Sequence, residues 1–430
     1  MRNSAIVLGS MAALLPIIAH AAGETSARPQ VHVVSPPTAA KEGLEPDDLP
    51  GPPLEVTTGT PTVRLPAIPD FPSAPDRAPA ASAPVTVVTQ APERRIVTLT
   101  ARNLSIDALN RCNEAIVQKR FAAAIGACRS SIAAWQDNHL AWYAAGNAHV
   151  ARDEWKDAAA SLAHAVALRP DIAMYQMIYG VALYEAEVER FRQERTNRAA
   201  SRPGDDGDDS SEGADRSADA PVLRLDAARA ALVRAATIAP TLWRTHSYLG
   251  LVYRDLRDPQ AAAEELTAAL RANPLDRPSY VALTELYRRA GFAQLALAVA
   301  GTGANNIPGS AELWFEVAMS YEALKDSERA IEALTKGLAV APESMILRLQ
   351  RGRLHVARHH NDLARRDLEP LKRLTDPRWA VIKEAAALFL ARLGGGETPQ
   401  DAYRVCKALN GCKIFKDVDQ VWLIEDWSTL

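Results

Sequence analysis

Small, apolar and proline residues recur with a long fixed period between about residues 105 and 376. Each period contains two apolar-patterned stretches of helical length, and a proline follows the second stretch. Proline cannot continue a helix, so it ends one period and turns the chain into the next. The repeats are 34 residues apart, except for one step of 70 residues between Gly180 and Gly250. The pattern predicts stacked pairs of helices with an insertion in one pair.

Three columns of the repeat keep this spacing independently. The small-residue column of the first helices contains Gly146, Gly180, Gly250, Thr284, Ala318 and Gly352. The small-residue column of the second helices contains Ala158, Ala228, Ala262, Ala296, Ala330 and Ala364. The proline column contains Pro170, Pro240, Pro274, Pro308 and Pro342. Small residues let paired helices cross closely, and larger neighbours such as Tyr253 and Leu266 fill the space beside the crossing.

The segments 141–170, 246–274 and 314–342, which carry these columns together with Trp142, Tyr253 and Tyr321, resemble tetratricopeptide repeats. The resemblance implies an all-α fold, a right-handed superhelical solenoid of helix pairs over residues 101–376. A degenerate repeat and a C-terminal cap are expected over residues 377–430. The resemblance is specific for the fold and leaves the partner open.

The chain before the repeats divides into two predicted parts. Residues 1–22 have the layout of a secretory signal peptide: Arg2, an apolar run from Ala5, and a small-x-small site at Ala19-His20-Ala21. Residues 23–100 are expected to form a disordered arm, because 15 of the 28 prolines lie there and the stretch shows no apolar periodicity. Fully extended, such an arm could reach on the order of 200 Å. We expect a periplasmic or secreted protein without a transmembrane helix.

Four cysteines, Cys112, Cys128, Cys406 and Cys412, allow three disulfide connectivities. An exported chain meets an oxidising compartment, which favours paired cysteines over catalytic ones. The local pairs Cys112 with Cys128 and Cys406 with Cys412 are preferred, because each pair lies in one helix hairpin or short unit. Four buried or reduced thiols are the alternative. The spacing does not match a zinc site.

The insertion in the third pair has an excess of about 36 residues, which is 70 minus 34. Its first part, EAEVERFRQERTNRA, is predicted to extend the first helix. The acidic part, about 196–220, is predicted to be a solvated loop, since its glycine and glutamate do not fall where a calcium loop needs them.

Candidate chemistry is sparse. His355 and His359 are four residues apart, so they could share one helical face and bind a metal, but His355 occupies an ordinary packing position and a structural role is favoured. We find no phosphate-binding loop, nucleophile elbow or His-Glu-x-x-His helix, and we predict no enzyme activity, no cofactor and no metal. The formal charge of -3, with scattered Lys and Arg, argues against nucleic acid.

In this architecture the first helix of each pair lines a concave groove that receives a peptide. The repeat register predicts that the groove is lined by Tyr143, Asn147, Arg244, Tyr248, Leu251, Arg254, Val281, Glu285, Arg288, Phe315, Met319, Glu322, Leu349 and Arg353. Asn147 would suit a carboxylate clamp, but the paired lysines of that clamp are absent. Our hypothesis is an exported scaffold that mediates protein–protein interaction in assembly of an envelope machine for secretion, pili or polysaccharide export. A module that binds cell-wall glycan or polysaccharide is the alternative.

Overall fold

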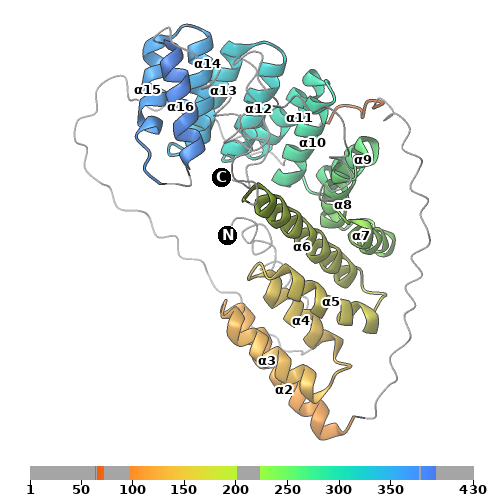
Figure 1. Ribbon diagram of the computed structural model, residues 1–430. Helices are drawn as coiled ribbons and strands as arrows, with labels where there is room; N and C mark the ends of the chain where they lie inside the picture. Colours follow the sequence, from red (N-terminus) through yellow and green to blue (C-terminus); the bar gives the residue numbers. More distant parts are fainter. Residues whose placement is uncertain (1–62, 64, 72–96, 201–222, 377–378, 394–430) are drawn as a thin grey trace, which may run out of the picture. The chain divides into compact units, whose positions relative to one another are not determined.

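The computed structural model describes residues 63, 65–71, 97–200, 223–376 and 379–393, and the regular structure in these ranges is α-helical (Figure 1). The first helices in the chain are α2 (Leu99–Val117), α3 (Phe121–Ala134), α4 (His139–Val150), α5 (Trp155–Leu168), α6 (Ala173–Ala200) and α7 (Asp226–Ile238). They are followed by α8 (Trp243–Asp255), α9 (Pro259–Ala272), α10 (Arg277–Arg289), α11 (Ala293–Asn306) and α12 (Ala311–Ala323). The last are α13 (Ser327–Val340), α14 (Met345–Ala357), α15 (Asn361–Lys372) and α16 (Ala380–Leu393).

The helices belong to two compact units, with the boundary inside α5. In the first unit, α3 packs against both α2 and α4, and α2 also contacts α4. The core of this unit contains Cys112 and Cys128, which are fully buried. In the same unit, the buried hydroxyl groups of Ser105 and Ser131 lie 2.9 Å apart, and the Asn138 side-chain amide donates to the Ser105 hydroxyl at 2.9 Å. This buried network satisfies polar groups that would otherwise destabilise the core.

In the second unit, each even-numbered helix from α6 to α14 packs against the helix that follows it, and consecutive pairs also contact one another. The predicted helix pairs are therefore present, and the 34-residue period corresponds to one pair. The core runs through these pairs and includes the buried side chains of Tyr280, Leu283, Leu313 and Phe389. Helix α16 begins the predicted last repeat, with Ala386 fully buried. Its proposed second helix lies outside the described residues.

The first and second helices of a pair cross at the predicted small residues. A Cβ atom added to Gly250 would lie 2.5 Å from Leu266 Cγ, and one added to Gly352 would lie 2.6 Å from Leu368 Cγ. Gly180 has the same relation to Leu232. A Cβ atom at these three positions would lie too close to the facing leucine, so that leucine or its helix would have to shift.

The turns between paired helices share a left-handed residue seven positions after the small residue of the first helix. The backbone has positive φ at Lys119, Asp153, Arg257, Gly291, Lys325 and His359. Glycine adopts this conformation without strain, whereas the other residues do so at a cost of roughly 1 kcal/mol or more. The repeat therefore imposes the turn geometry even where the sequence lacks glycine.

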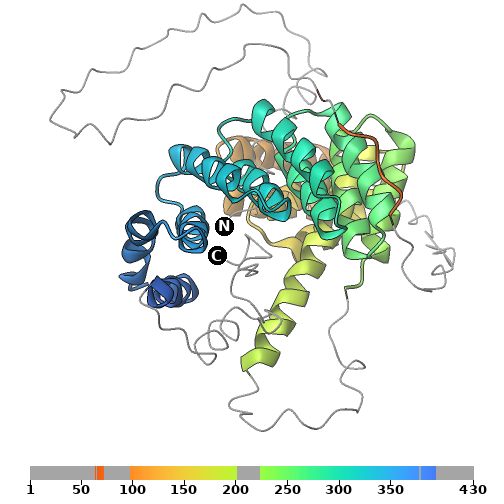
Figure 2. The same ribbon diagram turned by 90° about the horizontal axis from the view of Figure 1, so that it is seen from above.

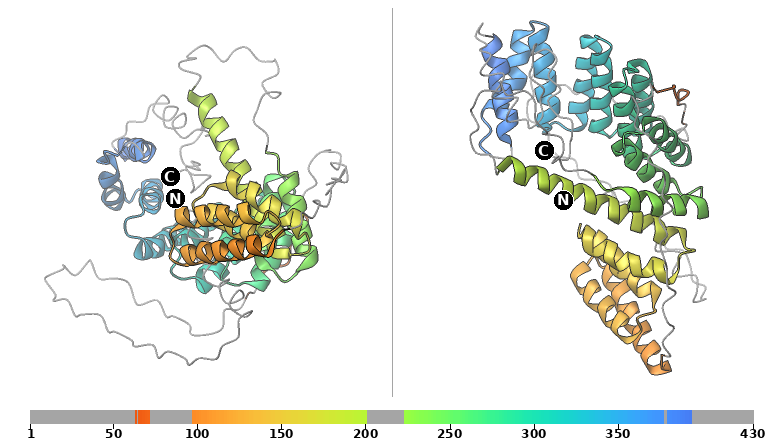
Figure 3. Two further views of the ribbon diagram at one scale, coloured as in Figure 1. Left: turned by 90° about the horizontal axis from the view of Figure 1, so that it is seen from below. Right: turned by 45° about the vertical axis from the view of Figure 1, so that its right-hand side comes forward.

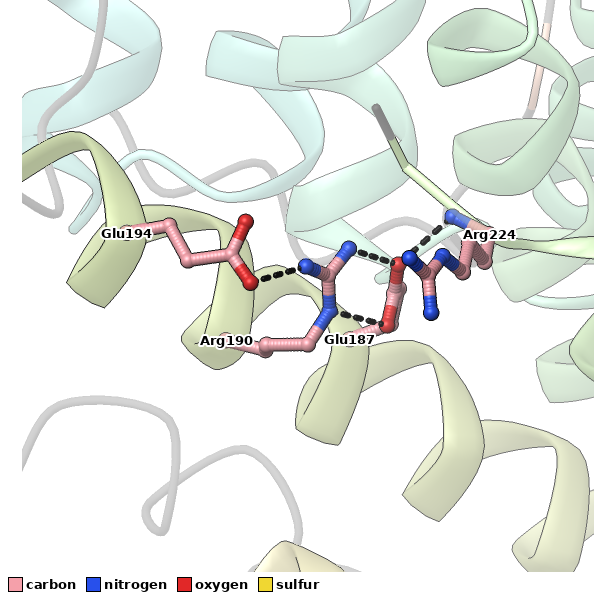
Figure 4. Close-up of polar contacts among 4 residues, drawn as sticks. All are labelled: Glu187, Arg190, Glu194 and Arg224. Atoms are coloured by element: carbon pink, nitrogen blue, oxygen red, sulfur yellow. Dashed lines mark hydrogen bonds and ion pairs between the residues drawn. The ribbon is translucent and has the colours of Figure 1, made fainter. Parts of the chain in front are cut away.

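The insertion begins as predicted, because α6 continues to Ala200 and is the long yellow-green helix in Figure 3. On this helix, the half-buried Arg190 binds Glu187 through both Nε and Nη2 and also contacts Glu194 (Figure 4). Glu187 in turn accepts the backbone N–H of Arg224 at 2.6 Å. Burial opposes ionisation of Glu187, but these hydrogen bonds lower its pKa. The residues that flank the insertion are thereby joined; the acidic part lies outside the described residues.

One part of the proline-rich arm departs from the expectation. Residues 65–71 have no helix or strand, as predicted, but Val63, Leu65, Ile68 and Phe71 pack against the core of the second unit. In Figure 2 this segment is the red trace that runs along the green helices. The arm predicted over residues 23–100 therefore includes a segment that is bound to the repeats, and α2 already begins at Leu99.

Candidate functional site

The predicted groove residues lie on the first helices of the pairs. Tyr143 and Asn147 are on α4 in the first unit, while the others are on α8, α10, α12 and α14 in the second unit. In the second unit, α10 contacts both α8 and α12. The structure therefore brings the predicted residues of these three helices together. Those that are partly exposed are called the first-helix surface: Arg244, Tyr248, Leu251, Arg254, Val281, Glu285, Arg288 and Glu322.

Several predicted residues are too buried to meet a partner. Phe315 and Met319 are 4% and 3% exposed, and Leu349 is 1% exposed. All three belong to the hydrophobic core of the second unit. Arg353 is 3% exposed. The core covers Phe315, Met319 and Leu349, and Arg353 is held by Glu322 and Gln350, so these four side chains do not line an open groove as the register predicts.

At the α6–α8 end of the first-helix surface, tyrosines and charged groups form a connected cluster. Tyr184 donates to Asp255 at 2.8 Å, and Arg254 Nε binds the same carboxylate at 2.8 Å. Tyr248 packs edge-on against Tyr184, with ring centroids 5.9 Å apart, and donates to Glu185 at 3.4 Å. Burial, followed by the neighbouring carboxylates, raises the pKa values of Tyr184 and Tyr248 well above 10. Both phenols therefore act as hydrogen-bond donors.

Between α10 and α12, a carboxyl group is buried beside an arginine. Glu316 is 3% exposed, and its Oε2 lies 3.8 Å from Arg288 Nη2. Burial raises the pKa of Glu316 to about 8; Arg288 opposes the shift, and Glu285 and Glu312 add to it. The carboxyl is therefore largely protonated at neutral pH. Burial also raises the pKa of Glu312, against the attraction of Arg277 at 3.3 Å.

Between α12 and α14, Arg353 binds Glu322 with its Nη2 and Gln350 with its Nε at 2.9 Å. The Arg254 and Arg353 side chains thus each bind a carboxylate of this chain. Because a paired arginine is already neutralised, these groups shape the surface more than they attract an anionic ligand. Arg244 stacks on Trp243, with its Cζ 4.9 Å from the ring centroid, and burial lowers its pKa.

The half-buried apolar side chains Leu251 and Val281 lie on α8 and α10 beside these charges. In the first unit, Tyr143 and Asn147 are also half-buried. Burial raises the pKa of Tyr143, and a hydrogen bond with Asn147 opposes the shift. Apolar positions bordered by fixed charges suit recognition of a peptide or helix rather than covalent chemistry.

The histidine pair does not form a metal site. Helix α14 ends at Ala357, so His359 lies in the following turn with φ 59° and is exposed. His355 is 6% exposed, and its Nδ1 lies 3.3 Å from His360 Nδ1. Burial lowers its pKa, as expected for a packing histidine. The shared helical face predicted for His355 and His359 is therefore wrong.

The first unit contains another group of potential metal ligands, which the sequence pattern does not predict. Ligand atoms of His149, Glu154 and Asp157 lie within 4.8 Å of one another. Glu154, however, already binds His149 at 2.7 Å and Arg152 at 2.6 Å. This arrangement is that of a hydrogen-bonded turn before α5, with its carboxylate already satisfied.

The structure contains the predicted disulfide between Cys112 and Cys128, whose Cα atoms lie 5.3 Å apart. It joins α2 to α3 at the position where Gly250 and Leu266 meet in a later pair, as the register predicts. Cys406 and Cys412 lie outside the described residues, so their pairing stays a prediction.

A second surface was missed altogether. Phe71 stacks on Tyr287, with ring centroids 5.9 Å apart and planes at 24°. It also meets Phe292 edge-on at 5.6 Å and 83°. The available signal was the sequence LPAIPDF, in which Leu65, Ile68 and Phe71 recur every third residue.

Residues 311–344, which include α12 and α13, match the tetratricopeptide repeat family. The chain contains a tetratricopeptide repeat. The other helix pairs of the second unit share its 34-residue period, apart from the insertion in α6–α7. In α6–α7, α8–α9 and α14–α15 a glycine of the first helix meets a leucine of the second. No curated protein matches the chain significantly.

Several solved structures are similar to parts of the chain. The alignment with a tetratricopeptide repeat protein from Parabacteroides merdae covers 67% of this chain and 99% of that protein, with 12% identity and a TM-score of 0.45. The alignment with Pseudomonas aeruginosa pilF covers 57% of this chain and 96% of pilF, with 16% identity and a TM-score of 0.41. The type IV pilus biogenesis factor PilW covers 56% and 94%, with 18% identity and a TM-score of 0.41. Within the described residues, we find no helix with both the length and the apolar character needed to cross a bilayer.

Proposed function

We propose that the chain is an exported scaffold that binds a protein partner through the first-helix surface of α8, α10 and α12. The observation that carries this proposal is the pair of half-buried apolar side chains, Leu251 and Val281, on neighbouring first helices with charged groups beside them. A peptide with apolar residues between charged ones would complement this surface. Helical repeats present such surfaces without a catalytic group.

Export is proposed from the N-terminal sequence, in which the Ala19-His20-Ala21 site follows an apolar run. The Cys112–Cys128 bridge supports this location, because structural disulfides persist in oxidising compartments. Assembly of an envelope machine for secretion, pili or polysaccharide export is the process we propose. Cell fractionation and N-terminal sequencing test the location: the mature chain should be found outside the cytoplasm and should lack the predicted signal peptide, residues 1–22.

Site-specific photo-cross-linking in the source cells tests the binding surface. A benzoylphenylalanine at Leu251 or Val281 should capture one protein, whereas the same group at the exposed Glu264 of α9 should not. A charge reversal at Glu285 should weaken capture from both positions, because Glu285 lies one helical turn from Val281 on α10, which packs against α8. Equal capture from Glu264, or no protein captured from Leu251 and Val281, would contradict the proposal; the latter is expected of a polysaccharide partner.

A further inference from the structure

The arm segment has the pattern of a polyproline II ligand. This helix has three residues per turn, so residues three apart share a face. Leu65, Ile68 and Phe71 follow that spacing and are partly buried against the repeats, while Ala67 and Asp70 are exposed. Proline follows Leu65 and Ile68 and restricts the backbone before binding, which reduces the entropy lost on docking.

The receiving surface differs from its counterparts in adjacent pairs. Tyr287, Tyr253 and Tyr321 occupy the same position of the repeat. Tyr253 and Tyr321 are half-buried, whereas Tyr287 is 1% exposed with Phe71 stacked on it. Burial raises the pKa of Tyr287 to about 12.

Phe292 provides the second, independent difference. It is the N-cap residue of α11 and makes no side-chain cap hydrogen bond. In the adjacent pairs this position is Asp258 or Asp326, and each aspartate accepts a backbone N–H at 3.1 Å. Losing such a cap typically destabilises a helix by about 1 kcal/mol. The aromatic ring replaces the cap with a contact to Phe71, and Gly291 makes the left-handed turn before it without strain.

We propose that Tyr287 and Phe292 form a binding site for a proline-spaced apolar peptide, and that residues 63–71 of the same chain are its ligand. The site lies at the turn between α10 and α11, apart from the first-helix surface. Aromatic side chains are the usual receptors for polyproline II segments, because the extended backbone presents its apolar side chains to flat rings. Docking anchors the arm to the second unit through Val63, Leu65, Ile68 and Phe71.

Photo-cross-linking in the full chain tests the contact directly. Benzoylphenylalanine at position 71 should cross-link to the tryptic peptides 272–288 and 290–325, which contain Tyr287 and Phe292. The matched control is the same group at the exposed Asp70, which should give much less of these products. An equal mixture of 15N-labelled and unlabelled chains should give only products of uniform label. Mixed-label products would show that a second copy supplies the peptide, and products at other helices would overturn the site.

Release of the segment can be measured by trypsin cleavage after Arg64, with cleavage after Arg77 as the internal reference. Phe71→Ala should raise the relative rate after Arg64 by about tenfold, because two aromatic contacts and the buried ring are lost. Phe292→Asp should raise it similarly while keeping α11 folded, since it restores the cap found at Asp258 and Asp326. Unchanged cleavage in both variants would overturn the proposal. If Phe292→Asp no longer shows a cooperative unfolding transition, the idea that an aspartate cap can replace the ring contact at the start of α11 is wrong.

Discussion

The helix pairs α2–α3 and α8–α9 cross at the same position of the repeat by different means. In α8–α9 the crossing consists of Gly250 against Leu266, which is fully buried. In α2–α3 the equivalent residues are Cys112 and Cys128, joined by a disulfide. The α8–α9 pair has a helix pair on each side, whereas among the described residues α2–α3 packs only against the helix that follows it. A pair with fewer neighbours gains less from packing, and a covalent link compensates.

The largest effect is expected where packing alone holds the crossing. Leu266→Ala should destabilise the second unit by about 2–5 kcal/mol, because the cavity opposite Gly250 cannot be filled by the backbone. Urea unfolding followed by circular dichroism measures this loss. Leu275→Ala is the matched control: this side chain is 54% exposed, and its removal should change stability by less than about 0.5 kcal/mol. Similar midpoints for the two variants would contradict the packing account of α8–α9.

Loss of the Cys112–Cys128 disulfide should destabilise only the α2–α3 pair and its own unit. Cys112→Ala/Cys128→Ala, or reduction of the native chain, should destabilise the first unit by about 3 kcal/mol, given the 16-residue separation of the cysteines. Hydrogen exchange should then accelerate in α2 and α3 and remain unchanged in α8 and α9. Reduction of the double variant is the control and should have no further effect on α2 and α3. Equal acceleration in both pairs would show that the bridge stabilises more than its own unit.

A third difference is that the first helices of the second unit enclose an ionisable group. Because the pKa of Glu316 is raised to about 8 from 4.5, the folded chain holds this proton more tightly than the unfolded chain. Its contribution to stability is therefore complete below about pH 4.5 and is lost as the pH rises through about 8. Glu316→Gln should remove this pH-dependent loss of stability, which amounts to about 1.4 kcal/mol for each unit by which the pKa is raised.

Urea midpoints measured between about pH 5 and pH 8 test this sign. The difference between Glu316→Gln and the native chain should grow with pH, with the variant more stable at the upper end. Glu264→Gln, exposed on α9, should follow the native chain throughout. A variant that is less stable at the upper end would indicate that the ion pair with Arg288 outweighs burial.

The repeat register predicts those contacts that recur in every helix pair. The crossing residues Gly250 and Leu266 and the Cys112–Cys128 bridge follow from it, because the same geometry recurs every 34 residues. It also could have placed His359 in a turn, since Lys325 and Arg257 occupy the same left-handed position.

The register could not predict contacts that belong to one pair alone. Phe315 and Met319 occupy groove positions, but neighbouring side chains bury them, and a periodic pattern does not describe that packing. Helical and strand periods do not describe the arm segment, because the apolar residues of LPAIPDF recur every third residue. Its docking site depends on Phe292, which departs from the repeat pattern. The role of this departure is evident only from its contact with Phe71.

The smallest expected effect concerns the start of the second helix in each compared pair. Asp258 caps α9 by accepting the Ala261 N–H at 3.1 Å, whereas Arg120 at the start of α3 makes no side-chain cap hydrogen bond. Both side chains are exposed, so exchanging them changes little packing. Asp258→Ala should destabilise the second unit by about 1 kcal/mol, and Arg120→Asp should stabilise the first unit by a similar amount.

Hydrogen exchange in the first turns of α3 and α9 resolves these two changes within one chain. Asp258→Asn is the control for α9, because asparagine caps about as well as aspartate and should leave exchange near the native rate. If Arg120→Asp slows exchange at the start of α3 even after the Cys112–Cys128 bridge is reduced, the cap and the bridge stabilise this pair independently. If the slowing disappears on reduction, the bridge is needed to hold the start of α3 in the geometry that a cap requires, and the two pairs differ in more than their crossing.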